Sequence, residues 1–326
     1  ATILVVGGLI LGLALRPAAQ DLPFSLLLQT DARYPFLRPL IGVTTTKEYG
    51  EKELAPLRDA VGNAARGLPA GAVTRYSYYF RDLTNGMWTG INEMDQYDPA
   101  SILKIVVAVA VFKQEEATPG FIYRRLTYTQ DLADINRGFS FAPPIALTVG
   151  QSYDVPYLLE QMLSNSDNGA KDLLLANLDQ PVVDHVYTDL AIRKPNDDNS
   201  AGYTISPLEF SRFLRILYYG TYNLSWENSN QLLKLLNKAT FTSGLVAGVP
   251  SSVSVAHKYG EHIIGAGKQV NGVELSDCGI VYHPTRPYLL CIMTEGKDPL
   301  VLGNFIALLS RVTYAEVNGG AKPSGG

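Results

Sequence analysis

The sequence predicts a mixed α/β fold in two parts: an antiparallel sheet flanked by helices from both chain ends, and an all-α subdomain. Three observations predict it. An amphipathic helix and a hairpin pattern come early, helical patterns fill residues 99–240, and strand patterns followed by a helix close the chain. Strands from the two ends must then pair across the helical insertion, which favours an active site between the two parts.

The first fifteen residues, ATILVVGGLILGLAL, are apolar and uncharged, and Arg16 and Pro17 end the run. A membrane span needs ~20 such residues and a signal-peptide core roughly 7–15. We expect residues 1–17 to be a membrane anchor or the remnant of an export signal; a buried strand or helix is the alternative. An anchor or signal would place the rest of the chain outside the cytoplasm, at the membrane or secreted, with residues 18–46 as a connector.

An amphipathic helix is expected over about residues 48–66, and the sequence GLPAG is expected to end it. Its apolar stripe consists of Leu54, Leu57, Val61 and Ala65. Two strand-like runs follow in AVTRYSYYFRDLTNGMWTGIN, joined by Thr84-Asn85-Gly86. Asn-Gly between β-rich runs is the strongest short signal for a hairpin.

Helices are predicted in the middle of the chain for SILKIVVAVAVFK, DVPYLLEQML, NGAKDLLLANL, SPLEFSRFLRILYYG and NSNQLLKLLNK. Strands return in VSVAHKYG, SDCGIVYH and YLLCIMTEG, and a last helix is predicted in LVLGNFIALLSRVTYAEV. The folded domain is expected to span residues 47–316, and residues 317–326 to form a polar, disordered tail.

The formal net charge is -4 and no basic stripe stands out, which argues against a nucleic-acid partner. No metal or other cofactor is expected, because the two cysteines lack metal-ligand spacing and the histidines are scattered: His185, His257, His262 and His283. Cys278 and Cys291 flank a predicted hairpin turn at HPTRP. Since the register is not fixed, a disulfide and a pair of buried free thiols both stay open.

Ser101 and Lys104 stand at the start of the apolar run in DPASILKIVVAVAVFK. Residues three apart lie on one face of a helix, so the Lys104 amine can reach the Ser101 hydroxyl. A serine hydroxyl needs an adjacent base to act as a nucleophile, and a lysine is a base only when burial or a nearby cation lowers its pKa. Taken alone, the stretch favours the plainer interpretation, in which Ser101 caps the helix and Lys104 extends to solvent.

Two further stretches carry reactive side chains. Ser166-Asp167-Asn168 precedes another apolar helix, where it could cap the helix or supply a proton-relaying hydroxyl and a carbonyl-binding amide. Lys258-Tyr259-Gly260 ends a strand pattern. There the lysine could discourage edge aggregation, or provide a cation for a substrate carboxylate beside a glycine that allows close approach.

Together and in this order, the three stretches resemble the signature set S-x-x-K, S-D-N and K-T-G of the serine β-lactamase and penicillin-binding protein superfamily. The resemblance is closest to the class A β-lactamases and covers roughly residues 48–315, with further similarity in TISPLEFSRFL and LVAGVPSS. The first two motifs match fully. The third departs, because Tyr259 replaces the usual threonine.

The resemblance implies four catalytic residues. Ser101 would be acylated, with Lys104 helping to remove its proton. Ser166 and Lys258 would move protons to the departing nitrogen, and Lys258 would also attract the substrate carboxylate.

It also implies the residues that bind substrate. Asn168 would bind the substrate's amide side chain, and the backbone N–H groups of Ser101 and Glu261 would form an oxyanion hole. Gly260 would let the substrate approach the strand. Tyr259 would stand where a substrate-binding hydroxyl is usual, with a ring that narrows the site.

The region expected to release the acyl group departs from the family. Class A enzymes use a glutamate on a loop between the S-D-N helix and a T-x-x-P stretch. Here that interval ends TDLAIRKPNDDNSAGYTISP and contains no glutamate. The nearby polar candidates, Asp197, Asp198 and Asn199, are more typical of a solvated turn, so slow deacylation is expected.

Two functions are compatible with these features. The first is a β-lactamase-like serine hydrolase that forms an acyl-enzyme on Ser101 with a small-molecule or peptide-like substrate, such as a β-lactam or a peptidoglycan-type amide. The alternative is a non-catalytic or penicilloyl-binding sensing module on the same fold, tethered to a membrane through the N-terminal segment.

Overall fold

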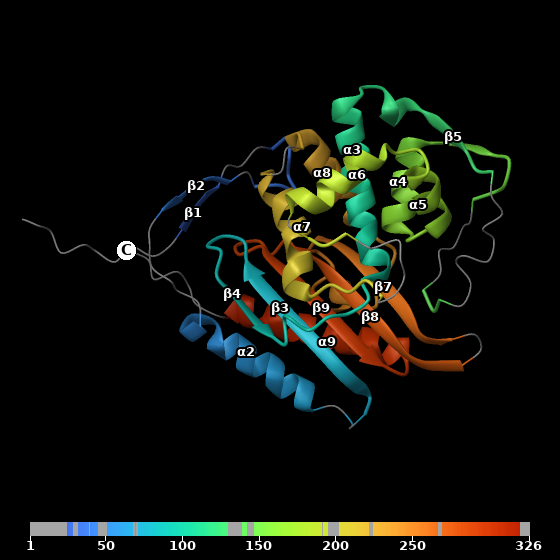
Figure 1. The fold of residues 1–326 in the computed structure, drawn as a ribbon. Helices are drawn as coiled ribbons and strands as arrows, with labels where there is room; N and C mark the ends of the chain where they lie inside the picture. Colours follow the sequence, from blue (N-terminus) through green and yellow to red (C-terminus); the bar gives the residue numbers. More distant parts are fainter. Residues whose placement is uncertain are drawn as a thin grey trace, which may run out of the picture.

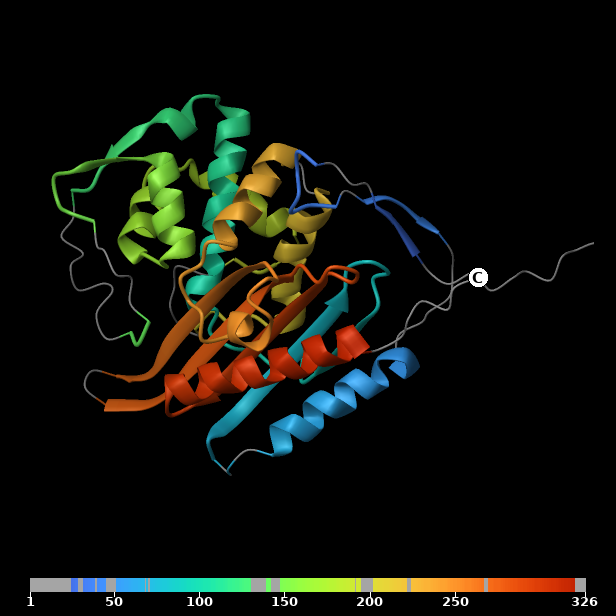
Figure 2. The same ribbon diagram turned by 180° about the vertical axis from the view of Figure 1, so that it is seen from behind.

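A computed structural model describes residues 25–28, 32–38, 40–44, 51–67, 69, 71–129, 139–141, 147–190, 192–194, 202–221, 224–266 and 269–319. A five-stranded antiparallel sheet lies in the middle, two long helices cover one of its faces, and a group of helices covers the other (Figures 1 and 2). The predicted two-part fold is confirmed.

The sheet has the strand order β4-β3-β9-β8-β7. Its strands are β3 (Val73–Asp82), β4 (Trp88–Ile91), β7 (Val255–Ala266), β8 (Gln269–Val281) and β9 (Tyr288–Gly296). The predicted Asn-Gly hairpin joins β3 to β4, and Gly86 has the positive φ of 81° that such a turn needs. β3 pairs with β9, so the two ends of the chain meet in one sheet as predicted.

The hairpin of β7 and β8 is longer than the sequence predicts. Pairing continues through EHIIGA and QVNGVEL, which were not assigned to strands. These stretches carry Glu261, His262 and Glu274, whose polarity is more typical of loops, and the register shifts between Ile264 and Gly265. Hydrogen bonds to neighbouring segments satisfy these polar side chains: Glu261 binds the Ser140 N–H, His262 binds Glu274, and Glu274 binds the Asp98 N–H.

Two helices pack on one face of the sheet: α2 (Glu51–Arg66) and α9 (Pro299–Gly319). The buried side chains between them and the sheet include Val61, Tyr78, Leu275, Ile292 and Phe305. α9 extends past the expected domain end at residue 316, since Val317 is still buried. Within the described part of the chain it is the one helix long and apolar enough to span a membrane, but half of it is buried, which identifies it as a core helix.

The other face carries the helical part of the chain. It consists of α3 (Lys104–Ala117), α4 (Val155–Ser164), α5 (Asn168–Leu175), α6 (Gln180–Asp189), α7 (Pro207–Tyr219) and α8 (Trp226–Leu236), with a short ribbon of β5 (Arg125–Thr127) and β6 (Ser152–Asp154). Three 3-10 turns complete the described elements: η1 (Ala100–Leu103), η2 (Phe121–Tyr123) and η3 (Leu245–Gly248). α3 is buried on every side over residues 105–112, as its uninterrupted apolar sequence predicts.

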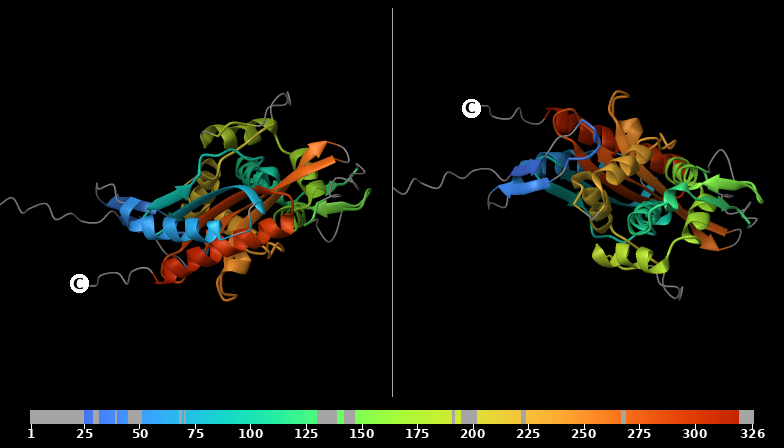
Figure 3. Two further views of the ribbon diagram at one scale, coloured as in Figure 1. Left: turned by 90° about the horizontal axis from the view of Figure 1, so that it is seen from below. Right: turned by 90° about the horizontal axis from the view of Figure 1, so that it is seen from above.

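Part of the expected connector is ordered against the domain. β1 (Ser25–Leu28) and β2 (Leu40–Thr44) form an antiparallel ribbon at the end of the molecule opposite the β7–β8 hairpin (Figure 3). Between them Leu37 is fully buried, and the Phe36 N–H donates to Asn230 Oδ1 at 3.1 Å. The expected anchor at residues 1–17 and most of the expected tail lie outside the described residues.

Cys278 and Cys291 form a disulfide between β8 and β9. They are directly opposite each other in the register, with a Cα–Cα distance of 3.9 Å, and both are fully buried. The structure therefore decides between the two alternatives that the sequence leaves open. Lys258 is the register partner of Cys278, so the disulfide lies in the same cross-strand row as the lysine of the third motif.

Candidate active site

Ser101 lies in the 3-10 turn η1, directly before α3. Its side chain caps neither η1 nor α3, so the helix-cap interpretation is wrong. The preceding residue, Ala100, has a positive φ of 44°, held by a hydrogen bond from its N–H to Asp98 Oδ1 at 2.7 Å. A non-glycine residue in this conformation costs about 1–3 kcal/mol, and such strain is commonest at functional sites.

Lys104 points from the first turn of α3 into the protein and is 2% exposed. Its Nζ donates to Ser101 Oγ at 2.9 Å, to Ser166 Oγ at 3.2 Å and to the Ser166 carbonyl. Burial, with the nearby cations Lys258 and Lys171, lowers the pKa of Lys104 well below its ordinary value. An amine with a lowered pKa, within hydrogen-bond distance of a serine hydroxyl, has the geometry of a base beside its nucleophile.

Ser166 and Lys258 complete the centre. Lys258 Nζ, on β7, donates to Ser166 Oγ and to the Tyr259 carbonyl, both at 2.9 Å. Burial lowers the pKa of Lys258 to about 7, against the opposing charge of Asp277. Ser166 also has a positive φ, 59°. The structure thus brings four residues that sequence analysis identified, from three separate stretches of the sequence, into one hydrogen-bonded group.

In the second motif, Ser166 and Asp167 have different roles. Asp167, not Ser166, caps α5: its Oδ1 accepts from the Ala170 N–H at 2.7 Å. The Ser166 hydroxyl does not cap α5 and instead accepts from the two lysines. Asn168 is the first residue of α5 and is partly buried. Its expected contact with substrate stays a prediction.

Gly260 brings β7 against the turn that holds Ser101. A Cβ at this position would lie 2.7 Å from the Pro99 carbonyl and 3.1 Å from the Ser101 and Ile102 nitrogens. Only glycine allows this approach without a shift of the backbone. The Ser101 N–H therefore lies beside the edge strand, where the N–H of Glu261 is expected to complete an oxyanion hole.

The side chains of Tyr259 and Glu261 have contacts that the sequence did not predict. The Glu261 carboxylate accepts hydrogen bonds from the N–H groups of Ser140 and Phe141, and the Tyr259 hydroxyl donates to the Phe141 carbonyl. Both residues are 5% exposed. They bind a segment of the protein itself, residues 139–141.

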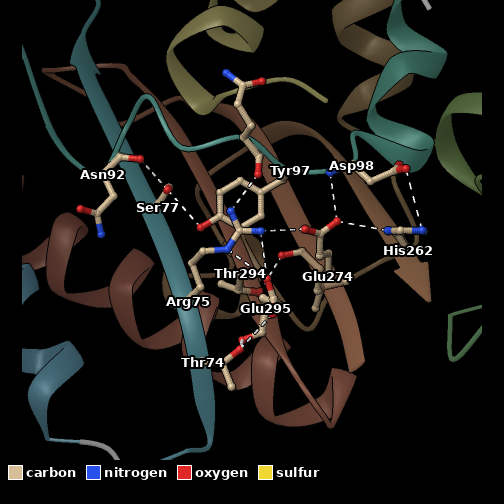
Figure 4. Close-up of polar contacts among 12 residues, drawn as sticks. Thr74, Arg75, Ser77, Asn92, Tyr97, Asp98, His262, Glu274, Thr294 and Glu295 are labelled. Atoms are coloured by element: carbon tan, nitrogen blue, oxygen red, sulfur yellow. Dashed lines mark hydrogen bonds and ion pairs between the residues drawn. The ribbon is translucent and has the colours of Figure 1, made fainter. Parts of the chain in front are cut away.

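A polar network anchors the turn before Ser101 to the sheet (Figure 4). Glu274 on β8 accepts from the Asp98 N–H at 3.0 Å, from Arg75 at 2.9 Å, and contacts His262 Nδ1 at 3.1 Å. The Arg75 guanidinium lies 4.0 Å from the ring centroid of Tyr97. Because Asp98 in turn accepts from the Ala100 N–H, this network runs from the sheet to the residue before the nucleophile.

Sequence analysis missed this network, because it depends on the register of two strands, which local sequence does not fix. His262 and Glu274 are direct register partners on β7 and β8. The predicted strands stopped short of both residues, so their facing positions were not seen. The hydrogen bond with Glu274 raises the pKa of His262, and burial raises that of Asp98.

No described glutamate near the centre is available to activate water. Glu261 and Glu274 are bound as described above. Glu209, the first glutamate after the Ser166 helix, forms the capping box of α7 with Ser206. Asp197, Asp198 and Asn199 lie outside the described residues.

Comparisons with known proteins agree with the motifs. A family model described as "Beta-lactamase enzyme family" matches residues 57–317. A beta-lactamase of Streptomyces fradiae is 25% identical over 270 residues, which cover 78% of this chain and 85% of the relative. A beta-lactamase of Kitasatospora aureofaciens is 24% identical over 259 residues, covering 75% and 80%.

Solved structures share the fold. PBP-A has a TM-score of 0.66 at 22% identity, covering 84% of this chain and 100% of its own, and its L158E mutant, an acyl-enzyme complex with penicillin G, is equally similar. A class A beta-lactamase from Mycobacterium abscessus has a TM-score of 0.65 at 22% identity, covering 80% and 99%. At these identities the likeness establishes the fold alone.

Proposed function

The chain belongs to the beta-lactamase enzyme family, and from this premise we propose that it is a serine hydrolase that forms a long-lived acyl-enzyme on Ser101. The substrate would be a β-lactam or a peptidoglycan-type amide. The observation that carries the proposal is the 2.9 Å contact between Ser101 Oγ and the buried amine of Lys104. Burial and the nearby lysines lower the pKa of Lys104, which supports its role as the base that a serine nucleophile needs.

Acylation uses the four residues of the centre. Ser101 Oγ attacks the carbonyl carbon of the amide while its proton passes to Lys104 Nζ. The N–H groups of Ser101 and Glu261 stabilise the resulting oxyanion, and each such donor typically contributes about 10²–10³ in rate. As the C–N bond breaks, the Ser166 hydroxyl gives its proton to the departing nitrogen and receives the proton held on Lys104, 3.2 Å away. Lys258 holds Ser166 Oγ in place from its other side.

Deacylation is proposed to be slow. Hydrolysis of the ester needs a base that removes a proton from water. The interval between Ser166 and Pro207 contains no glutamate, and the described glutamates around the centre are all bound to other groups. Water therefore attacks the acyl-enzyme without an evident base.

A time course by intact-protein mass spectrometry tests the proposal. Wild-type protein mixed with benzylpenicillin should gain the mass of the whole β-lactam and keep it for minutes to hours. The Ser101→Ala variant should gain nothing. If the wild type shows no adduct with several β-lactams after long incubation, the proposal is wrong.

One alternative has an observation in its favour. The absence of a deacylating glutamate also suits a non-catalytic, penicilloyl-binding sensor tethered to a membrane, in which the acyl-enzyme is the signal. Turnover separates the two functions. Nitrocefin or peptide hydrolysis that continues beyond one equivalent, above the Ser101→Ala background, excludes the sensor.

We also propose that the domain works outside the cytoplasm, attached to the membrane or secreted. The apolar stretch over residues 1–15 supports this location, and so does the Cys278–Cys291 disulfide, because disulfides persist in oxidising compartments. Protease added to intact cells should then degrade the domain. Protection until the cells are lysed would contradict this location.

A further inference from the structure

Tyr79 and Arg81 on β3 lie on the face of the sheet that α7 covers. Alternate residues of a strand share a face, and Tyr79 packs into the buried cluster under the helices. The Tyr219 hydroxyl of α7 donates to the Leu83 carbonyl at 3.2 Å, which places this part of the helix over the end of β3. Arg215 lies one turn before Tyr219 on the same face of α7, so the structure brings Arg215 close to Tyr79 and Arg81.

These side chains include three buried polar atoms without a hydrogen-bond partner: Tyr79 Oη, Arg81 Nε and Arg215 Nε. They are three of the six such atoms in the part of the chain that the structure describes, so half of them gather at one place. Buried polar atoms are rarely left without a partner in folded proteins, and a bound ion or water is a common reason when they are.

The positive charge at this place has no carboxylate to balance it. Among the described residues neither Arg81 nor Arg215 forms an ion pair. The neighbouring carboxylate of Asp82 is already bound by Arg286, at 2.8 and 3.0 Å. Burial, with the nearby charges of Arg81 and Arg212, lowers the pKa of Arg215 from its ordinary value. An arginine nevertheless stays protonated in proteins, so water can hydrate this pair of cations but only an anion can neutralise it.

The same place is open to solvent on one side. Arg81 and Arg215 are partly exposed. Trp88, the register partner of Arg81 on β4, is 42% exposed, and its ring centroid lies 5.7 Å from that of Tyr79. A guanidinium presents a planar fork of N–H groups that matches two oxygens of a carboxylate or a phosphate. The Tyr79 hydroxyl, which has no partner, can donate one more hydrogen bond.

We propose that Arg81, Arg215 and Tyr79 form a binding site for a small oxyanion, a phosphate or a carboxylate, between β3 and α7. The oxyanion balances the two guanidinium charges and accepts from the Tyr79 hydroxyl. In the sheet, β9 and β8 separate β3 from β7, so this site is distinct from the centre around Ser101. The inference therefore does not depend on the proposed function.

The fluorescence of Trp88 tests the proposal. Trp226→Phe protein, with the rest of the chain intact, has Trp88 as its single tryptophan. It is titrated with sodium phosphate and, separately, with sodium acetate, each against sodium chloride at the same ionic strength. Phosphate or acetate should give a saturable change that chloride does not give, and the tighter of the two identifies the ligand as a phosphate or a carboxylate. At about ten times its Kd, this anion should also raise the midpoint of thermal unfolding by about 2–4 °C.

Two variants in the Trp226→Phe background locate the site. Arg81→Met and Arg215→Met remove one charge each and keep a long side chain, and each should weaken anion binding about tenfold or more. In chloride alone, each variant should unfold at the same temperature as the parent or a higher one, because one of two repelling cations is gone. Arg58→Met makes the same change at an exposed arginine of α2, on the other face of the sheet, and should leave the affinity unchanged.

An equal response to chloride overturns the inference, and so does the absence of any saturable response. Affinity that is unchanged in both Arg81→Met and Arg215→Met also overturns it, because the anion then binds elsewhere. If these variants do not fold, the comparison of phosphate and acetate with chloride in the parent protein still decides.

Discussion

Lys104 and Lys258 donate to the same oxygen, Ser166 Oγ, at 3.2 Å and 2.9 Å. Both amines are buried, and burial lowers the pKa of both. The charge of Lys258 adds to this effect at Lys104. One hydroxyl between two amines of low pKa is a short route for a proton from Ser101 to a leaving group.

The free energy of unfolding should rise with pH between about 7 and 10. The unfolded chain keeps the Lys258 proton up to the ordinary pKa of 10.5, whereas the folded protein loses it at about 7. Within this window the unfolded state binds more protons, so stability rises by up to about 1.4 kcal/mol per pH unit for each such lysine. Above pH 10 the slope should reverse, because burial raises the pKa of Tyr78 and Tyr288 and ionisation then favours the unfolded chain.

Urea unfolding at several pH values measures this slope. Lys258→Met should reduce the dependence of the free energy of unfolding on pH by the contribution of this one lysine. The variant should also be more stable than the wild type at pH 7. An equal slope in the variant would show that the buried amine is not the source.

Lys104→Ala should reduce the rate constant of acylation by about 10²–10⁴ without unfolding the protein, since it removes the base next to Ser101. Quenched-flow mass spectrometry of Ser101 measures the rate. Lys234→Ala, an exposed lysine of α8, is the matched control and should acylate like the wild type. Near-wild-type acylation in Lys104→Ala would mean that another group takes the proton.

Glu274→Ala should slow acylation more than it weakens substrate binding, because Glu274 positions Asp98 and through it the strained Ala100. It should also destabilise the protein by about 1–3 kcal/mol, the range for leaving buried polar partners unsatisfied.

Glu295→Ala is the control for this change. Glu295 also binds Arg75, at 2.9 Å, but its side chain is 31% exposed, and such a pair contributes about 1 kcal/mol or less. Acylation kinetics over a range of substrate concentrations separate rate from affinity. Equal effects of the two variants on the rate would contradict the positioning role of Glu274.

The order of motifs was sufficient to predict which residues form the centre. Spacing on a helix placed Lys104 near Ser101, and the family resemblance placed Ser166 and Lys258 with them. β-rich runs bounded by turn signals also predicted the sheet, and strands such as β9 are buried on both faces.

Features that depend on register were not predicted. The facing of His262 and Glu274, and the disulfide of Cys278 and Cys291, follow from which residues of neighbouring strands stand opposite each other. A one-residue slip would reverse both, and local sequence does not fix it. The contacts of Tyr259 and Glu261 with residues 139–141 were missed for a similar reason, since about 120 residues separate the partners.

The double variant Cys278→Ala/Cys291→Ala should lower the free energy of unfolding by about 2–4 kcal/mol, because the bond closes a loop with a sequence separation of 13 and constrains the unfolded chain. Thermal unfolding with and without reductant checks this. Reductant should destabilise the wild type and leave the double variant unchanged. A double variant as stable as the wild type would contradict the prediction.

Gly260→Ala should lower the rate of Ser101 acylation more than a methyl group added at any other position of the sheet edge. The new Cβ would meet the Pro99 carbonyl at 2.7 Å and the Ser101 nitrogen at 3.1 Å, and these are backbone atoms that cannot move aside alone. Overpacking of this kind costs about 1–3 kcal/mol, and here it displaces the Ser101 turn itself.

The matched control is Gly62→Ala in α2, where the nearest atom would lie at 3.6 Å and alanine favours the helix. Gly62→Ala should therefore keep wild-type acylation with equal or higher stability. If Gly260→Ala also acylates at the wild-type rate, β7 does not set the position of Ser101, and the oxyanion hole assigned to this edge must lie elsewhere.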